Sequence, residues 1–262
     1  ILSGLVGSEM CIRDRHIPLG VRSRLRLYAA QCILKLATCD AYASLILPRM
    51  GRLSYALQDE CFQVRMHLLH DLLLYLMRNE LPTEFHAAIF LVAFDPEDEP
   101  RVQVASYTRR LQVLPPIVRH ERLERIIVRF LHLLAHHPDL NVESPQTMCS
   151  FSRYLEFYLA CVACEANVGV LARFTACVRT YIDLSLSEPS VENSRPLYAM
   201  AELAQFLIQR LADNHGWTIY PVDEEAPCPT DILRSTGTVA RSVLDGEVWE
   251  LLLSLIHISE PT

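Results

Sequence analysis

The stretch CFQVRMHLLHDLLLYLMRN (Cys61–Asn79) decides the fold class of this 262-residue chain. Its apolar residues recur at spacings of three and four, which is the period of an α-helix. They form a broad stripe, made of Phe62, Met66, Leu69, Leu72, Leu73 and Leu76 and widened by Val64, Leu68 and Leu74. A helix that is apolar over most of its girth has to be covered on two sides. The stretch therefore predicts the inner helix of a layered helical array.

The same spacing continues on both sides of this stretch, from about Arg22 to Asn214, and no sustained period-two alternation competes with it. Proline and glycine residues divide the region into helices joined by short turns. The main breaks are at Pro48, Gly51, Pro82, Pro96, Pro115, Pro116, Pro138, Pro145, Pro189 and Pro196. The pattern predicts an all-α protein without a β-sheet.

Three helix-opening segments align without gaps, and they begin at Leu25, Val64 and Val102, so their spacings are 39 and 38 residues. Acidic turns precede the second and third, at Asp59 and Asp95, and we expect each carboxylate to cap the helix that follows. A period of about 40 residues with an acidic turn is typical of HEAT repeats, in which helix pairs stack on their neighbours. We expect a curved, right-handed HEAT-repeat solenoid of antiparallel helix pairs over residues 16–214.

The two ends differ from this pattern. Residues 1–15 contain GLVGSEMCIRDR (Gly4–Arg15), which resembles translated cloning-adapter sequence, and residues 254–262 resemble the same kind of read-through. Between the solenoid and this tail, residues 215–253 carry Gly216, Pro221 and an acidic patch. We predict a connector there, with one possible short helix near its end.

The composition excludes several classes of protein. Hydrophobic residues make up 51% of the chain and the net charge is only −7, which excludes disorder as the main state. The longest apolar runs are too short for a membrane span. An acidic balance argues against direct nucleic-acid binding, which requires a dense basic surface. Nine cysteines, an odd number, fit a reducing intracellular compartment better than a disulfide framework.

No motif predicts catalysis, a cofactor or a bound metal. Cys161 and Cys164 have CxxC spacing, but we place them within a helix as two buried structural thiols, because a second pair of ligands is missing. His132, His136 and His137 lie near one helix end beside Asp139. His132 and His136 have the i,i+4 spacing of metal ligands, but no HExxH glutamate accompanies them, and we favour interaction with the helix dipole as their explanation. The sequence has no glycine-rich phosphate loop. We expect no enzyme, no cofactor and no small-molecule substrate.

A basic cluster is the candidate partner-binding site. Arg122, Arg125 and Arg129 share one face of the helix predicted after Pro116, opposite its apolar stripe, and Arg119 lies one turn earlier. We call Arg119, Arg122, Arg125 and Arg129 the arginine ridge. Glu121 and Glu124 partly neutralise it, so a solvated face with local ion pairs is the alternative. As a binding surface, the ridge would suit an acidic peptide or another polyanion, because arginine makes bidentate contacts.

Several strings carry a family resemblance. They are LRLYAAQCILKLA (Leu25–Ala37), LQDECFQVR (Leu57–Arg65), LPTEFHAAIFLVAFDPEDE (Leu81–Glu99), HLLAHHPDL (His132–Leu140) and LYAMAELAQFLI (Leu197–Ile208). Together they resemble the precocious-dissociation-of-sisters family of HEAT-repeat proteins in sister chromatid cohesion. The match is collinear from about Ser23 to Val222, and it corresponds to the later part of a much longer solenoid.

The resemblance implies a non-catalytic scaffold in the nucleus, associated with chromatin. The implied partners are the cohesin ring, through its kleisin subunit, and the wings-apart-like release factor. The resemblance transfers no catalytic residue and no numbered contact residue. A generic helical-repeat adaptor of transport or phosphatase type remains the alternative, with a thiol or metal enzyme as a distant third.

Overall fold

The structure is a computed structural model that describes residues 18–221, 228–244, 246, 248–251 and 254. The adapter-like segment 1–15 and all of 255–262 lie outside the described residues, so this part of the domain division stays a prediction. Among the described helices, none has the length and apolar character needed to cross a membrane.

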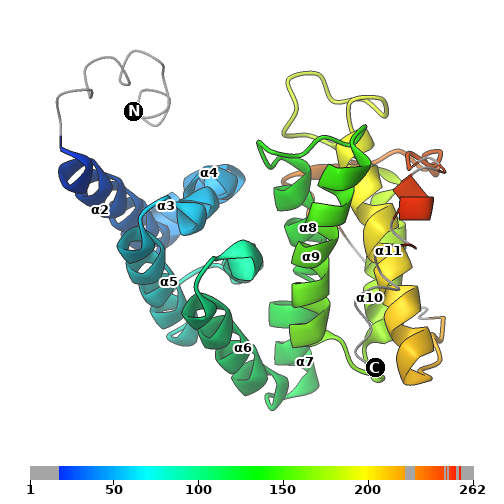
Figure 1. Ribbon diagram of the computed structural model, residues 1–262, viewed down its shortest axis with the longest axis horizontal. Helices are drawn as coiled ribbons and strands as arrows, with labels where there is room; N and C mark the ends of the chain where they lie inside the picture. The colour runs from blue at the N-terminus through cyan, green and yellow to red at the C-terminus, as the bar shows by residue number, and fades with distance from the viewer. Residues whose placement is uncertain (1–17, 222–227, 245, 247, 252–253, 255–262) are drawn as a thin grey trace.

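Two rows of helices form the all-α solenoid that the sequence predicted (Figure 1). Neighbours in the first row pack side by side in chain order: α2 (Leu19–Ala37), α5 (Phe62–Met77), α6 (Asp98–Gln112) and α9 (Pro145–Val162). The second row consists of shorter elements: α3 (Asp40–Ile46), η3 (Leu47–Arg49), α4 (Met50–Ser54), η4 (Tyr55–Gln58), η5 (Thr83–Phe94), α8 (Ile127–Ala135) and α10 (Val168–Val178). A long helix, α11 (Arg195–His215), packs against α8, α9 and α10.

The 3-10 helix η5 lies at the centre of the core. Its eight consecutive residues 85–92 are all buried, because α5, α8 and α9 all pack against it. The Phe90 ring contacts Tyr158 edge-on with a centroid separation of 4.9 Å, and it lies 5.7 Å from the Phe130 ring. These aromatic contacts join both rows of helices into one hydrophobic core.

Arginine–aspartate pairs connect successive repeats. Arg26 on α2 donates from Nε to Asp59 at 2.6 Å, and Arg65 on α5 donates from Nε to Asp95 at 2.6 Å. A second bond, from Arg65 Nη2 to Asp95 at 3.1 Å, makes that pair bidentate. Each pair therefore joins a helix of one repeat to the acidic turn of the next repeat.

The expectation that these aspartates cap the following helices is wrong. Helix α5 has Cys61 as its N-cap residue and α6 has Glu97, and neither helix has a side-chain cap. Asp59 and Asp95 lie two residues before these caps, where each accepts one backbone N–H and closes a turn. Their main partners are the arginines, because a buried carboxylate is stabilised more by a bidentate guanidinium than by one amide.

The pairing changes at the third aligned segment. Gln103 stands where Arg26 and Arg65 stand in the first two segments, and its amide contacts only Glu99 on its own helix within the described part of the chain. Arg101 instead turns back to the carbonyl oxygen of Asp95 and to the carboxylate of Asp98. Within the described residues, arginine–aspartate pairs therefore join the first aligned segment to the second and the second to the third, and the series ends there.

We predict that Arg65→Ala lowers the free energy of unfolding by roughly 3–5 kcal/mol, because it leaves a buried carboxylate unpaired. The Asp95 side chain is only 1% exposed, whereas the Arg26 side chain is 38% exposed. Arg26→Ala should therefore cost about 1 kcal/mol. Gln103→Ala is the matched control and should change stability by less than about 0.5 kcal/mol. Urea denaturation measures all three variants, and equal losses for Arg65 and Gln103 would contradict the prediction.

The prediction of a fold without a sheet is wrong at one place. Strand β1 (Tyr181–Asp183) pairs antiparallel with β2 (Leu233–Ser235), with Ile182 opposite Arg234. The two strands lie far apart in the sequence and each has three residues, so neither carries a readable alternation of its own.

The segment predicted as a connector also belongs in part to the core. Cys228, Ile232 and Leu233 are buried, and the Trp249 ring lies 5.0 Å from Phe206 of α11. The buried carboxylate of Glu202 on α11 accepts the backbone N–H groups of residues 243 and 244. The folded unit therefore extends beyond Asn214, the predicted end of the solenoid.

Candidate functional site

The arginine ridge lies on an interrupted helix instead of a regular one. Helix α7 (Pro116–Arg119) continues into the π-helical turn η6 (His120–Glu124), in which the Arg125 N–H donates to the His120 carbonyl at 2.9 Å. In a π turn the hydrogen bond joins residues five positions apart, whereas in an α-helix it joins residues four positions apart. The residues after the π turn are therefore rotated around the helix axis relative to a regular α-helix. The shared face predicted from a period of 3.6 therefore does not persist into α8.

Arg129 is not part of an exposed ridge, and this corrects the sequence prediction. It is only 3% exposed, and its guanidinium donates to both carboxylate oxygens of Asp231 at 2.8 Å. All of residues 127–134 on α8 are buried. The change of helical phase at η6 and the cover provided by residues 228–231, which lie beside Arg129, explain why this arginine points inward.

The other three ridge arginines are half-buried and differ in their partners. Arg119 pairs with the buried carboxylate of Glu124 at 3.2 Å, and Arg125 pairs with Glu121 at 3.2 Å. Arg122 has no carboxylate partner among the described residues. The positive charge that the ridge offers to a partner is therefore concentrated at Arg122.

A buried histidine lies next to Arg122. His86 Nδ1 lies 2.7 Å from the Thr83 carbonyl, so this nitrogen carries the proton, and Nε2 accepts from the Tyr107 hydroxyl at 2.9 Å. Burial lowers the pKa of His86 to about 4, and the Arg122 charge adds to this effect although the Thr83 hydrogen bond opposes it. Burial also raises the pKa of Tyr107. The pair is therefore neutral at physiological pH.

We predict that His86 makes the fold sensitive to acid. In the unfolded state His86 takes up a proton near pH 6.5, but in the folded state it does so only near pH 4. The contribution of His86 to the free energy of unfolding is therefore fully present above pH 6.5 and is lost as the pH falls toward 4. Between pH 7 and pH 5 the loss from this one group is about 2 kcal/mol. Urea denaturation at both pH values measures it, and His86→Gln should reduce the pH dependence by that amount.

The exposed His67 on α5 supplies the control for this experiment. His67→Gln should leave the difference in stability between pH 7 and pH 5 unchanged, because this side chain is exposed and folding does not remove it from water. An equal reduction in the His67 and His86 variants would refute the assignment.

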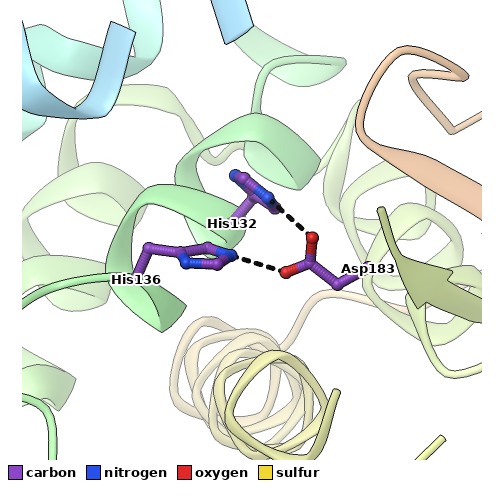
Figure 2. A group of neighbouring side chains, drawn as sticks. All are labelled: His132, His136 and Asp183. Carbon is purple, nitrogen blue, oxygen red and sulfur yellow. Dashed lines mark hydrogen bonds and ion pairs between the residues drawn. The ribbon is translucent and has the colours of Figure 1, made fainter. Parts of the chain in front are cut away.

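Three side chains that the sequence did not bring together meet at the end of α8 (Figure 2). His132 and His136, one helical turn apart, both direct Nε2 at the carboxylate of Asp183 on β1. His132 Nε2 lies 3.2 Å from Oδ1, and His136 Nε2 lies 2.6 Å from Oδ2. Sequence reasoning missed Asp183 because it lies 47 residues beyond His136 in a strand too short to predict.

The charges of this cluster are set by its burial. Burial lowers the pKa of His132, although Asp183 opposes this shift. Burial alone would raise the pKa of Asp183, but hydrogen bonds from His132 and His136 outweigh it and hold this pKa well below its usual range. The carboxylate is therefore ionised and accepts from both rings. His137, predicted in the same group, points elsewhere and contacts the Gln58 amide oxygen at 2.9 Å.

A cleft of about 780 Å³ opens beside this cluster, between the segment 47–55 and α8. Leu47, Pro48 and Pro138 contribute apolar surface, and Arg49 and Arg52 contribute exposed positive charge. No aspartate or glutamate is among its lining residues in the described part of the chain. The cleft is therefore an electropositive, partly apolar hollow, and sequence reasoning did not identify it because its two walls come from different repeats.

The placement of the CxxC pair within a helix is wrong in part. Helix α9 ends at Val162, so Cys161 is on the helix and buried, whereas Cys164 is in the following turn and only half-buried. Asn167 accepts the Cys164 N–H and forms this turn. Both thiols are free, and burial raises the pKa of Cys161. A raised pKa disfavours the reactive thiolate.

Comparisons with known proteins agree with the resemblance. Residues 1–234 match the family described as sister chromatid cohesion protein PDS5. The chain is 27% identical over 226 residues to the Pds5 cohesion protein of Schizosaccharomyces pombe and 23% identical over 250 residues to that of Saccharomyces cerevisiae. It is 36% identical over 148 residues to PDS5 homolog A of Danio rerio.

These alignments cover 86%, 87% and 52% of the chain, but only 18%, 20% and 11% of the respective relatives. The chain therefore spans a fifth or less of the length of these proteins. Because the family match extends over most of its residues, the chain belongs to the PDS5 family of sister chromatid cohesion proteins.

Proposed function

We propose that this chain is a non-catalytic part of a longer helical-repeat scaffold that regulates the cohesin ring in sister chromatid cohesion. Membership of the PDS5 family over residues 1–234 is the observation that carries the proposal. The proposed partners are the kleisin subunit of cohesin and the wings-apart-like release factor, and the proposed location is chromatin in the nucleus. Stacked repeats support this role, because they present an extended surface to partner proteins.

Two surfaces are the candidates for a partner with an acidic segment. The first is what remains of the arginine ridge, namely Arg119, Arg122 and Arg125, with its unpaired charge at Arg122. The second is the cleft beside α8, where Arg49 and Arg52 are exposed and no carboxylate is among the described lining residues. On a chain with a net charge of −7, such local positive surfaces favour an acidic partner.

The cleft has the better physical case. Glu121 and Glu124 already neutralise Arg125 and Arg119, so an incoming acidic group at the ridge competes with existing ion pairs. In the cleft, apolar surface from Leu47, Pro48 and Pro138 lies next to the charge. A peptide with an apolar anchor and flanking acidic residues would bury area there as well as pair with arginine.

Paired charge reversals in the 262-residue chain test these surfaces. We predict that Arg49→Glu with Arg52→Glu weakens binding of the purified kleisin subunit more than tenfold, because like charges then face the acidic segment. Arg122→Glu with Arg125→Glu tests the ridge in the same way. Fluorescence anisotropy at two salt concentrations measures the affinities, and added salt should weaken the wild-type complex.

Arg24 and Arg78 provide a matched control, because both are exposed and neither lines the cleft or belongs to the arginine ridge. Their double reversal changes the net charge by the same amount and should leave the affinity within about twofold. Equal weakening in all three variants would show a general charge effect and reject both surfaces. If the wild-type chain binds neither kleisin nor the release factor, the cohesin assignment of this segment fails and the generic adaptor is favoured.

A further inference from the structure

We propose that His132, His136 and Asp183 bind one divalent transition-metal ion of the Zn²⁺ type, held between α8 and β1. The inference is independent of partner binding and concerns the cluster at the end of α8 (Figure 2). The proposal rests on geometry, donor chemistry and access.

The geometry places all three donors around one point. His132 in the last turn of α8 and His136, its C-cap residue, are four residues apart and project from the same face, with ring centroids 4.5 Å apart. One ligand atom from each residue lies within 4.8 Å of the others. Zinc bonds of about 2.1 Å at tetrahedral angles separate two ligand atoms by about 3.4 Å. The separation of 3.2 Å between His132 Nε2 and Asp183 Oδ1 matches this value.

The other pair needs only a small adjustment. His136 Nε2 and Asp183 Oδ2 are 2.6 Å apart as a hydrogen-bonded pair, and they would move apart by less than about 1 Å to hold an ion. His136 is able to make this movement, because it follows the last residue of α8 and about a third of its side chain is exposed. His132 is more buried and supplies the fixed ligand.

The donor set selects the class of ion. Two imidazoles and one carboxylate suit zinc and its neighbours in the transition series, whereas magnesium and calcium prefer oxygen ligands throughout. The two imidazoles and the carboxylate supply three or four donor atoms, and water completes the coordination at a remaining open position. The Ser185 hydroxyl, 3.0 Å from His132 Nε2, and the adjoining cleft provide polar contact and space at that position.

The nearby positive charge of Arg129 does not prevent binding. Its guanidinium lines the same cleft but is paired with both oxygens of Asp231, so much of its charge is compensated. Asp183 remains as the negative ligand of the ion. The bound ion would join α8 to β1, and through the β1–β2 pairing it would stabilise the segment that covers Arg129.

Titration of the intact 262-residue chain with ZnCl₂ tests the proposal. Isothermal calorimetry should give one saturable site with a dissociation constant in the micromolar range or below, and excess Zn²⁺ should raise the melting temperature. His136→Gln keeps a hydrogen-bonding side chain at this partly exposed position but removes one imidazole. This variant should bind at least tenfold more weakly and lose the melting shift, with its circular dichroism spectrum unchanged.

His67→Gln is the matched control, since His67 is an exposed histidine on α5, and it should bind like the wild type. Free cysteines such as the exposed Cys32 and Cys39 are the competing ligands. The Co²⁺ spectrum of the wild-type chain separates these cases without any variant. Four-coordinate d–d bands without thiolate charge-transfer absorption are expected. Thiolate absorption, unaltered binding by His136→Gln, or no saturable binding would each overturn the proposal.

Discussion

The buried pair between Arg65 and Asp95 is the interaction on which the register of the stack depends. Both side chains are almost completely withdrawn from water, so each charge requires the other in a fixed, two-bond geometry. Arg65 also donates to the backbone carbonyl of Asp59, in the turn that begins its own repeat. One guanidinium therefore holds two successive turns at a set distance, and sliding one repeat along the next would leave a buried charge unpaired.

Beyond α6 the chain replaces this regular device with long-range contacts. The series of arginine–aspartate pairs between repeats ends at Gln103. Three other contacts hold the later helices: Arg129 pairs with Asp231, Glu202 accepts backbone N–H groups near residue 243, and the two histidines contact Asp183. The first two contacts recruit the segment that follows α11, and the third recruits β1, which pairs with that segment through β2. The second half of the molecule is thus a bundle locked by its C-terminal segment, whereas the first half is a periodic stack (Figure 1).

Local pattern was sufficient for the helices and their stacking, because periodicity and turn residues act within about 20 residues. The family was indicated by the resemblance of whole strings of sequence. The apolar stripe of Cys61–Asn79 is an example, since five of its six leucines and Val64 are buried, although Phe62 at its start is exposed. The candidate sites were harder to predict. A π turn, invisible to a regular helical wheel, removed Arg129 from the ridge. Asp183 and the arginines of the cleft reach their neighbours only through tertiary contacts, which the spacing of residues along the chain does not encode.

The Arg129–Asp231 pair has a kinetic consequence. It joins residues 102 positions apart, whereas contacts in an ideal repeat array involve only adjacent repeats. Folding of an ideal repeat array can begin at any repeat and spread to its neighbours. In this chain, however, Arg129 on α8 has its carboxylate partner at Asp231, so its charge stays uncompensated until synthesis has passed residue 231. Closure of such a long loop is slow and entropically costly. Folding of the second half during synthesis should therefore finish late, as one cooperative event that includes the short sheet.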